Sequence, residues 1–272
     1  MTLRRLDAEL TRRGLARSRE HAQVLIDEGN VLVRGAVARK AATRVDDGDP
    51  ILISELAEHS WVSRGAHKLL GALDTFAQLR VENRYALDAG ASTGGFTEVL
   101  LTRGVAGVVA VDVGYGQIAW SLREHQRVHL LERTNVRHLE VTQLPWRPDL
   151  ITGDLSFISL GVVLPALVGC MTPEGDLCLL VKPQFEAGRE HVKRGVVRDP
   201  QQHGAAIANV ARTAEAHGCW VMGVTASPLL GPAGNREFFI WLRRSLVPPV
   251  EVLRGGALDS AILAVVSEVR GD

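Results

Sequence analysis

The sequence predicts an α/β protein in two parts, a small N-terminal α+β domain and a larger domain built on a mostly parallel sheet. Three observations indicate this. From about residue 61 onward, short apolar segments alternate with helical stretches, which is the pattern of βα units. The first of these segments runs into a glycine-rich turn at 88–97. Upstream, residues 1–44 carry ten basic and five acidic residues, whereas 45–58 carry five acidic and no basic residues.

Spacing and capping residues predict two short helices in the N-terminal part. Leu6 and Leu10 are one turn apart, and Gly14 marks the end of the first helix. Ser18 is placed to cap a second helix that ends near Gly29. Short strands are expected at 31–33 and 51–53. The arginines of this region form either a solvated helix face or a surface for phosphates.

The remainder of the chain predicts strands separated by helices. Strands are expected at 86–88, 107–112, 128–131, 150–154, 177–182, 221–225 and 238–242, with a helix from Phe96 and another at 201–217. A long uncharged run, 155–173, approaches the length of a membrane span. Because it contains Pro165 and lies between two strands, a loop and a buried helix are favoured. We expect domains at 1–60 and 65–270, with a linker at 61–64.

Composition narrows the class of protein. The chain has 272 residues, 46% hydrophobic and 23% charged, as expected for a globular protein. Its three cysteines form no CxxC pair, so we expect no disulfide framework, no metal site and a cytoplasmic location. The N-terminus lacks the apolar core of a signal peptide. We expect no membrane association, and nothing in the sequence requires more than a monomer.

The glycine-rich turn at 88–97 indicates a cofactor site. Small residues let the backbone approach a ligand closely, but a dinucleotide fingerprint would need glycine where Ser92 stands. Asp112 ends the next strand, where it can accept hydrogen bonds from ribose hydroxyls. This pattern is typical of S-adenosylmethionine-dependent methyltransferases. The predicted cofactor-binding residues are Asp88, Gly90, Ala91, Ser92, Gly94, Gly95, Phe96, Asp112, Val113, Asn135 and Asp154.

Lysine is rare in this chain, with 4 lysines against 27 arginines. Lys182 follows the fifth strand of the sheet, and Lys68 lies on the helix before the first strand. Each alone could be an exposed charge, but lysine, unlike arginine, can act as a base. The sequence Asp154-Leu155-Ser156-Phe157 lacks the prolines of enzymes that methylate amines. Cys170 and Cys178 are predicted to be packing residues and therefore not nucleophiles. With amine methylation also disfavoured, we expect the group that accepts the methyl to be an oxygen.

The two lysines, with Asp154 and Glu237, resemble the Lys-Asp-Lys-Glu set of ribose 2′-O-methyltransferases of the FtsJ/RrmJ type. The resemblance implies that Lys182 is the general base. It also implies that Lys68 favours the neutral form of Lys182 and helps to position the ribose hydroxyl of the substrate. It also implies that Asp154 and Glu237 orient the lysines. The role of Phe157 stays open between stacking on a base and simple packing.

The N-terminal segments Arg5-Leu6-Asp7, Arg13 to Arg19 and Val31 to Gly35 resemble the alpha-L RNA-binding module. That module occurs in a ribosomal protein and in many pseudouridine synthases. The resemblance implies that its two helices present arginines to folded RNA. With Arg64 of the linker and Arg137 of the larger domain added, the RNA-binding candidates are Arg5, Arg17, Ser18, Arg19, Lys40, Arg64 and Arg137.

From residue 4 to 267 the chain resembles the TlyA family. The resemblance is carried by the segments 63–69, 88–97, 111–117, 154–159, 182–186 and 231–237. It implies a Rossmann-like class I S-adenosylmethionine-dependent methyltransferase with a small N-terminal α+β RNA-binding domain. The implied reaction is 2′-O-methylation of cytidine ribose in 16S and 23S rRNA, with S-adenosyl-L-methionine as cofactor and ribosomal subunits as partners.

Two other functions fit parts of the sequence. The family's older name, hemolysin, suggests a pore-forming cytolysin, for which only 155–173 is long enough. A pseudouridine synthase would share the alpha-L module, but the remaining 200 or so residues do not resemble its fold.

Overall fold

The computed structural model describes residues 3–27, 29–53, 61–187, 195–231 and 233–268. It divides into two compact units, Met1–Ala66 and His67–Asp272. Residues 54–60 lie outside the described residues, so the domain limits at 60 and 65 and the linker between them stay predictions.

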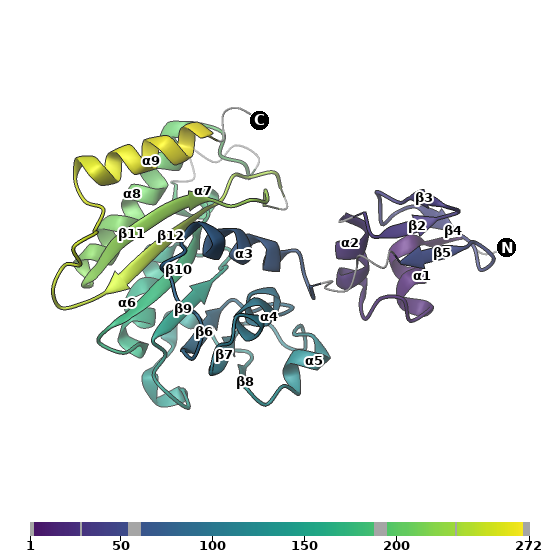
Figure 1. The fold of residues 1–272 in the computed structure, drawn as a ribbon, viewed down its shortest axis with the longest axis horizontal. Helices are drawn as coiled ribbons and strands as arrows, with labels where there is room; N and C mark the ends of the chain where they lie inside the picture. Colours follow the sequence, from purple (N-terminus) through teal and green to yellow (C-terminus); the bar gives the residue numbers. More distant parts are fainter. Residues whose placement is uncertain (1–2, 28, 54–60, 188–194, 232, 269–272) are drawn as a thin grey trace. The chain divides into compact units, whose positions relative to one another are not determined.

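The first unit combines two short helices with short strands (Figure 1). Its elements are β1 (Arg4–Arg5), α1 (Leu6–Arg12), α2 (Arg19–Asp27), β2 (Val31–Val33), β3 (Ala36–Val37), β4 (Arg44–Val45) and β5 (Ile51–Ile53). The strands form a sheet of order β3-β2-β5 and a β1-β4 pair. The predicted helices and the strands at 31–33 and 51–53 are confirmed. The prediction for Ser18 is also confirmed, because its Oγ accepts the N–H of His21 at 3.1 Å and caps α2.

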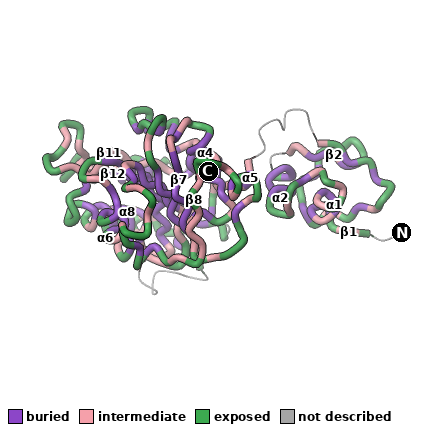
Figure 2. Tube along the Cα trace, turned by 90° about the horizontal axis from the view of Figure 1, so that it is seen from below, coloured by how far each residue is buried: buried purple, intermediate pink, exposed green. Residues whose placement is uncertain are grey.

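The second unit is built on a seven-stranded sheet of order β11-β12-β10-β9-β6-β7-β8. The strands are β6 (Tyr85–Ala89), β7 (Gly107–Val111), β8 (Val128–Leu131), β9 (Leu150–Gly153), β10 (Gly175–Val181), β11 (Cys219–Ala226) and β12 (Phe238–Arg244). All seven predicted strands are present. Only β12 runs against its neighbours, pairing antiparallel with β10 and β11. The central strands β7, β9 and β10 are buried along their length (Figure 2).

Helices cover both faces of this sheet (Figure 1). They are α3 (Gly65–Thr75), α4 (Gly95–Thr102), α5 (Trp120–Arg123), α6 (Leu160–Cys170), α7 (Pro183–Glu186), α8 (Pro200–Ala216) and α9 (Gly256–Glu268), with 3₁₀ turns η2 (Val136–His138) and η3 (Val141–Gln143). One face, the α8 face, carries α6, α8 and α9. The other, the α3 face, carries α3 and α4, where Phe76 packs on Trp241 and Phe96 on Phe239.

Alternation along the strands assigns side chains to these faces. On β12, Phe238 and Ile240 join the α8-face core, whereas Phe239 and Trp241 meet α4 and α3. On β9, Ile151 belongs to the α8 face. The residues at the alternate positions of these strands point to the α3 face. The polar residues at the strand ends occupy such positions and therefore share that face.

The uncharged run 155–173 forms a loop and the buried helix α6, as predicted. Within the described residues, no helix combines the length and apolarity needed to cross a membrane. Helix α9 was not predicted, although Leu258, Ile262 and Val265 recur at helical spacing and the last two are buried.

Candidate active site

The four predicted catalytic residues meet at the carboxyl edge of the sheet. Because β12 is antiparallel to β10, with Val181 opposite Phe238, Lys182 just after β10 and Glu237 just before β12 lie at the same edge. Asp154 directly follows β9, the parallel neighbour of β10. Lys68 comes from the first turn of α3, on the same face of the sheet. The sequence prediction thus named residues that the fold brings together from four separate segments.

The contacts within this cluster are direct. Lys68 Nζ lies 2.6 Å from Glu237 Oε2 and 3.4 Å from Asp154 Oδ2. Lys182 Nζ lies 2.5 Å from Asp154 Oδ1. The cluster is withdrawn from solvent, with Lys68 4%, Lys182 7% and Glu237 2% exposed. In such surroundings these charges interact more strongly than on the surface.

Asp154 is the carboxylate that both lysines share. Burial by itself would raise the pKa of Asp154, but Lys68 and then Lys182 outweigh that effect and hold it below its usual value. Asp154 is therefore ionised at neutral pH. Glu237 Oε1 has no hydrogen-bond partner among the described residues, and a Cβ on Gly231 would lie only 2.6 Å from it. Gly231 thus leaves the room that the Glu237 carboxylate occupies.

The two lysines differ in what surrounds them. Lys68 contacts two carboxylates, those of Asp154 and Glu237. Lys182 contacts one carboxylate and a neutral hydroxyl, Ser156 Oγ at 2.8 Å. Lys182 therefore contacts one negative charge, whereas Lys68 contacts two. Lys193, the remaining lysine of this unit, lies outside the described residues.

A cavity of about 490 Å³ opens beside the cluster. Among the predicted cofactor residues, those that line it are Gly90, Ser92, Asp112, Val113, Asn135 and Asp154. Gly90 has a left-handed φ of 83°, and a Cβ there would lie 2.8 Å from the carbonyl oxygen of Asp154. A bare backbone at Gly90 therefore lets the turn pass close to the loop that follows β9. The size of the cavity, its largely apolar walls and the carboxylate of Asp112 fit an adenosine-bearing cofactor.

Asp112 is fixed by backbone donors. Its Oδ2 accepts the N–H of Ser92 at 2.8 Å, and its Oδ1 accepts the N–H of Gly114 at 2.7 Å. Each carboxylate oxygen has further acceptor capacity. The side chain is therefore held in one orientation and can still accept hydrogen bonds from ribose hydroxyls.

Other predicted cofactor residues lie beneath the turn and do not line the cavity. They are Asp88, Ala91, Gly94, Gly95 and Phe96, all buried. Asp88 is fully buried on the α3 face, where it accepts hydrogen bonds from Thr97 Oγ1 at 2.7 Å and Thr152 Oγ1 at 3.4 Å. Burial, with Asp154 nearby, raises the pKa of Asp88 to about 7. Asp88 therefore supports the turn from below.

Two polar residues missed by the sequence analysis, Ser156 and Glu186, fix the loop after β9. Glu186 on α7 accepts the hydroxyl of Ser159 at 2.6 Å and the N–H of Leu160 at 2.7 Å. Phe157 packs against Phe185, with ring centroids 5.2 Å apart, and adopts a left-handed φ of 64°. The loop that carries Asp154 and Ser156 is thus tied to the segment that carries Lys182. Contacts between residues this far apart in the sequence leave no local pattern. In the sequence, only the positions of Ser156 and Glu186 within the motif segments 154–159 and 182–186 could have indicated them.

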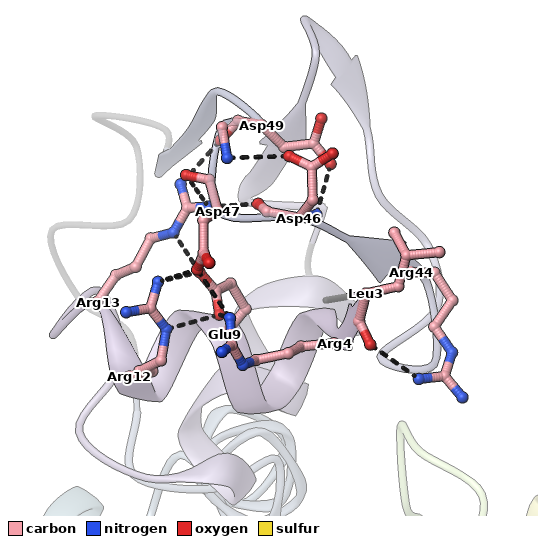
Figure 3. A network of polar contacts seen from close by, with 10 residues as sticks. Leu3, Arg4, Glu9, Arg12, Arg13, Arg44, Asp46, Asp47 and Asp49 are labelled. Carbon is pink, nitrogen blue, oxygen red and sulfur yellow. Dashed lines mark hydrogen bonds and ion pairs between the residues drawn. The ribbon is translucent and has the colours of Figure 1, made fainter. Parts of the chain in front are cut away.

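In the first unit, many arginines are neutralised by nearby carboxylates (Figure 3). Glu9 is fully buried and accepts from Arg12 at 2.5 Å and Arg13 at 2.7 Å. The hydrogen bonds from Arg12 and then from Arg13 outweigh burial, which would raise the pKa of Glu9, and lower that pKa to about 2. Asp47 binds both Arg4 and Arg12. The basic excess in the sequence therefore overstates the charge available for a partner.

The RNA-binding candidates fall into two groups. Arg5 and Arg19 both bind Asp7, at 3.1 and 2.7 Å, while Ser18 caps α2. Arg17, Lys40 and Arg137 are exposed, and Arg64 is half-buried. Arg137 belongs to η2, which the Asn135 side chain caps at 3.0 Å.

Comparison with known proteins gives one consistent result. Residues 61–244 match the FtsJ-like methyltransferase family and residues 4–51 match the S4 domain. The chain is 54% identical over 265 residues, 97% of each chain, to a Mycobacterium tuberculosis protein named 16S/23S rRNA (cytidine-2′-O)-methyltransferase TlyA. It is 41% identical over 240 residues, covering 88% of this chain and 85% of the relative, to the putative rRNA methyltransferase YqxC of Bacillus subtilis. A solved structure, a putative hemolysin from Streptococcus thermophilus, is 36% identical with a TM-score of 0.76, covering 100% of this chain and 98% of that one.

Proposed function

Because this chain belongs to the TlyA family, an S4 domain joined to an FtsJ-like methyltransferase domain, we propose that it methylates the 2′-hydroxyl of cytidine in 16S and 23S ribosomal RNA. The cluster of Lys68, Asp154, Lys182 and Glu237 beside the cavity is the observation that carries the proposal. We further propose S-adenosylmethionine as the cofactor, ribosomal subunits as the substrate, and action as a monomer in the cytoplasm.

The cavity residues hold the cofactor in this proposal. Asp112 would accept hydrogen bonds from the ribose hydroxyls of the cofactor, and Gly90 and Ser92 would line the wall beside it. When bound, S-adenosylmethionine supplies a methyl group on a positively charged sulfur, which keeps the bonding electrons and leaves as a neutral thioether. The walls formed by Leu155 and Ile158 exclude water from this region.

Lys182 removes the proton that the reaction must lose. A ribose hydroxyl is a weak nucleophile, so its proton must depart as its oxygen bonds to the methyl carbon. Lys182 Nζ accepts that proton and becomes an ammonium beside Asp154, which is 2.5 Å away and ionised. Lys68, held by Glu237, keeps a fixed positive charge next to Asp154 and helps to position the hydroxyl.

The S4 domain grips RNA through cations that lie exposed on its surface. Arg17 and Lys40 are the strongest candidates there, with Arg64 and Arg137 contributing from the rest of the chain. Replacing Arg17 or Lys40 by alanine is expected to weaken binding to ribosomal RNA. Loss of a phosphate contact should also reduce the slope of log affinity against log salt by about one.

The decisive experiment is to map 2′-O-methyl nucleotides on ribosomal RNA after incubation of subunits with protein and cofactor. The wild type should methylate cytidine ribose, and Lys182→Ala should abolish the transfer while cofactor affinity stays within about twofold. Products methylated on a base, or full activity of Lys182→Ala, would refute the proposal.

The cytolysin alternative can be tested in the same preparation. The segment it would need, α6, packs in the core of the α8 face, and no helix in the described part of the chain suits a membrane span. We expect no leakage from liposomes with wild type or Lys182→Ala. Leakage that persists in a catalytically inactive variant would support the alternative.

A further inference from the structure

Ser156 occupies an unusual place beside the proposed base. It lies two residues after Asp154, lines the cavity, and its Oγ is 2.8 Å from Lys182 Nζ. The lysine amine is buried, whereas Ser156 is exposed to the cavity side. The hydroxyl therefore contacts the buried amine from the wall of the cavity, as the carboxylate of Asp154 does.

The amine nitrogen of Lys182 can form hydrogen bonds in only a few directions. An sp³ nitrogen on a lysine carries its stem carbon and three further positions. Asp154 Oδ1 at 2.5 Å takes one N–H and Ser156 Oγ at 2.8 Å takes another. Among the residues that the structure describes, no third polar partner of this nitrogen is found. The remaining position is where a neutral amine holds its lone pair.

We propose that Ser156 is a positioning residue that, together with Asp154, turns the lone pair of Lys182 toward the substrate hydroxyl. The inference rests on the proposed function, because it takes Lys182 as the base. Without the serine, the amine would be anchored by Asp154 alone and could rotate about its Cε–Nζ bond. Rotation would place the lone pair correctly for only part of the time, which lowers the rate of proton transfer.

The surrounding structure holds the serine in place. The loop begins at Asp154, whose N–H donates to the carbonyl of Ala89 at 3.1 Å. It ends at Ser159, whose hydroxyl donates to Glu186 at 2.6 Å. Between them Phe157 has the left-handed φ of 64°, a conformation that non-glycine residues adopt only where the surroundings fix it. A loop fixed at both ends can aim a single hydroxyl.

The charges around Lys182 determine how the substitution affects pH dependence. Asp154 faces it from the loop after β9, and Lys68 on α3 and Glu237 before β12 face it through the cluster. A hydroxyl oxygen binds an ammonium more strongly than a neutral amine, so it favours the charged form. Removal of the Ser156 hydroxyl should therefore let the Lys182 amine lose its proton at lower pH.

The test is the single-turnover methylation rate on ribosomal subunits as a function of pH, for Ser156→Ala and Ser156→Thr. We expect Ser156→Ala to lower the rate on the plateau of the pH–rate profile about 10- to 100-fold, within the range of general-base effects. We also expect it to move the acid limb, where the rate rises with pH, about 0.5–1 pH unit lower. Ser156→Thr, which keeps the hydroxyl, should restore most of the rate and the limb. Cofactor affinity should change less than about threefold in either.

Three controls separate the possible failures. Ser260→Ala removes an exposed hydroxyl on α9 and should match the wild type. If Ser156→Ala keeps the wild-type plateau and limb while Lys182→Met is inactive, the inference is wrong and the proposed function stands. If Ser156→Ala is slow with an unmoved limb and threonine does not rescue it, Ser156 only supports the loop, which also overturns the inference. An active Lys182→Met would remove the proposed function itself.

Discussion

The first unit and the sheet edge that carries the lysine cluster in the second unit bury carboxyl groups with different partners. In the first, Glu9 is fully buried, and Arg12 and Arg13 bind it. In the second, Asp154 and Glu237 meet Lys68 and Lys182. The same unit also buries Asp88 completely, with the hydroxyls of Thr97 and Thr152 and the backbone N–H of Thr97 as hydrogen-bond donors.

The difference follows the chemistry of the cations. Arginine stays charged and its planar group binds a carboxylate through two N–H groups at once, which suits a fixed scaffold. Lysine can give up its proton, so it belongs where a proton must move. In a chain with 27 arginines and 4 lysines, Lys68 on α3 and Lys182 after β10 belong to the proposed reaction, whereas the arginines that bind Glu9 belong to the architecture.

Exchanging lysine for arginine in the cluster tests this contrast most strongly. Lys182→Arg keeps the positive charge beside Asp154 but removes the group that can act as a base. We expect methyl transfer to fall by about 10²–10⁴-fold, the range for loss of a general base, with cofactor affinity little changed. The measurement is the single-turnover rate on ribosomal subunits. Retention of more than a tenth of the wild-type rate would mean that a permanent cation suffices.

Asp88 gives the second test, because it is the buried carboxyl without a cation. Its pKa rises from 3.8 to about 7 on folding, so the folded state holds a proton that the unfolded chain has lost. Stability therefore falls as pH rises from about 4 to about 7 and stays lower above that range. Asp88→Asn should remove this fall, improving stability at pH 8 relative to pH 4 by up to about 4 kcal/mol.

Chemical denaturation of the full chain at several pH values measures this effect. Asp259→Asn, an exposed acid on α9, is the matched control and should follow the wild type. A stability curve for Asp88→Asn that runs parallel to the wild type would show that Asp88 is ionised throughout.

Much of the fold was predictable because its signals are local. Strands such as 150–154 and 177–182 are short apolar runs, and Ser18 and Gly14 mark helix ends through their own backbone preferences. Lys68 and Glu237, which are 169 positions apart, were joined by resemblance to a known arrangement; spacing alone could not pair them. Antiparallel β12 supplies the physical reason that they meet.

Other features lay beyond the sequence because they depend on tertiary partners. The arginines of the first unit read as a free basic surface until Glu9 and Asp47 were found against them. Asp88 read as a cofactor ligand, but alternation along β6 turns it under the turn toward Thr97. Helix α9 has little charge contrast between its faces, so its periodicity is weak.

Removing the charge of Glu9 tests the first unit. Arg12 and Arg13 lower its pKa to about 2, so its contribution to stability is present above about pH 4.5, its unfolded value, and is lost as pH falls toward 2. Glu9→Gln should destabilise the S4 domain by about 1–3 kcal/mol at pH 7 and by much less near pH 2. Hydrogen exchange of α1 amides in the full chain reports this domain alone. Equal destabilisation at both pH values would contradict the assignment.

Arg13→Lys is expected to have the smallest effect. It tests whether Glu9 needs the geometry of arginine or only a positive charge. Arg13 donates to Glu9 at 2.7 Å and to the carbonyl oxygens of Asp46 and Asp49, each at 2.8 Å. A lysine amine is a point donor and cannot span the carboxylate and both carbonyls. We expect a loss of about 1 kcal/mol in the same exchange measurement, whereas Arg44→Lys, at an exposed site, should change little. An Arg13→Lys protein as stable as the wild type would show that charge alone holds Glu9, and that arginine in this unit is a preference of composition rather than of geometry.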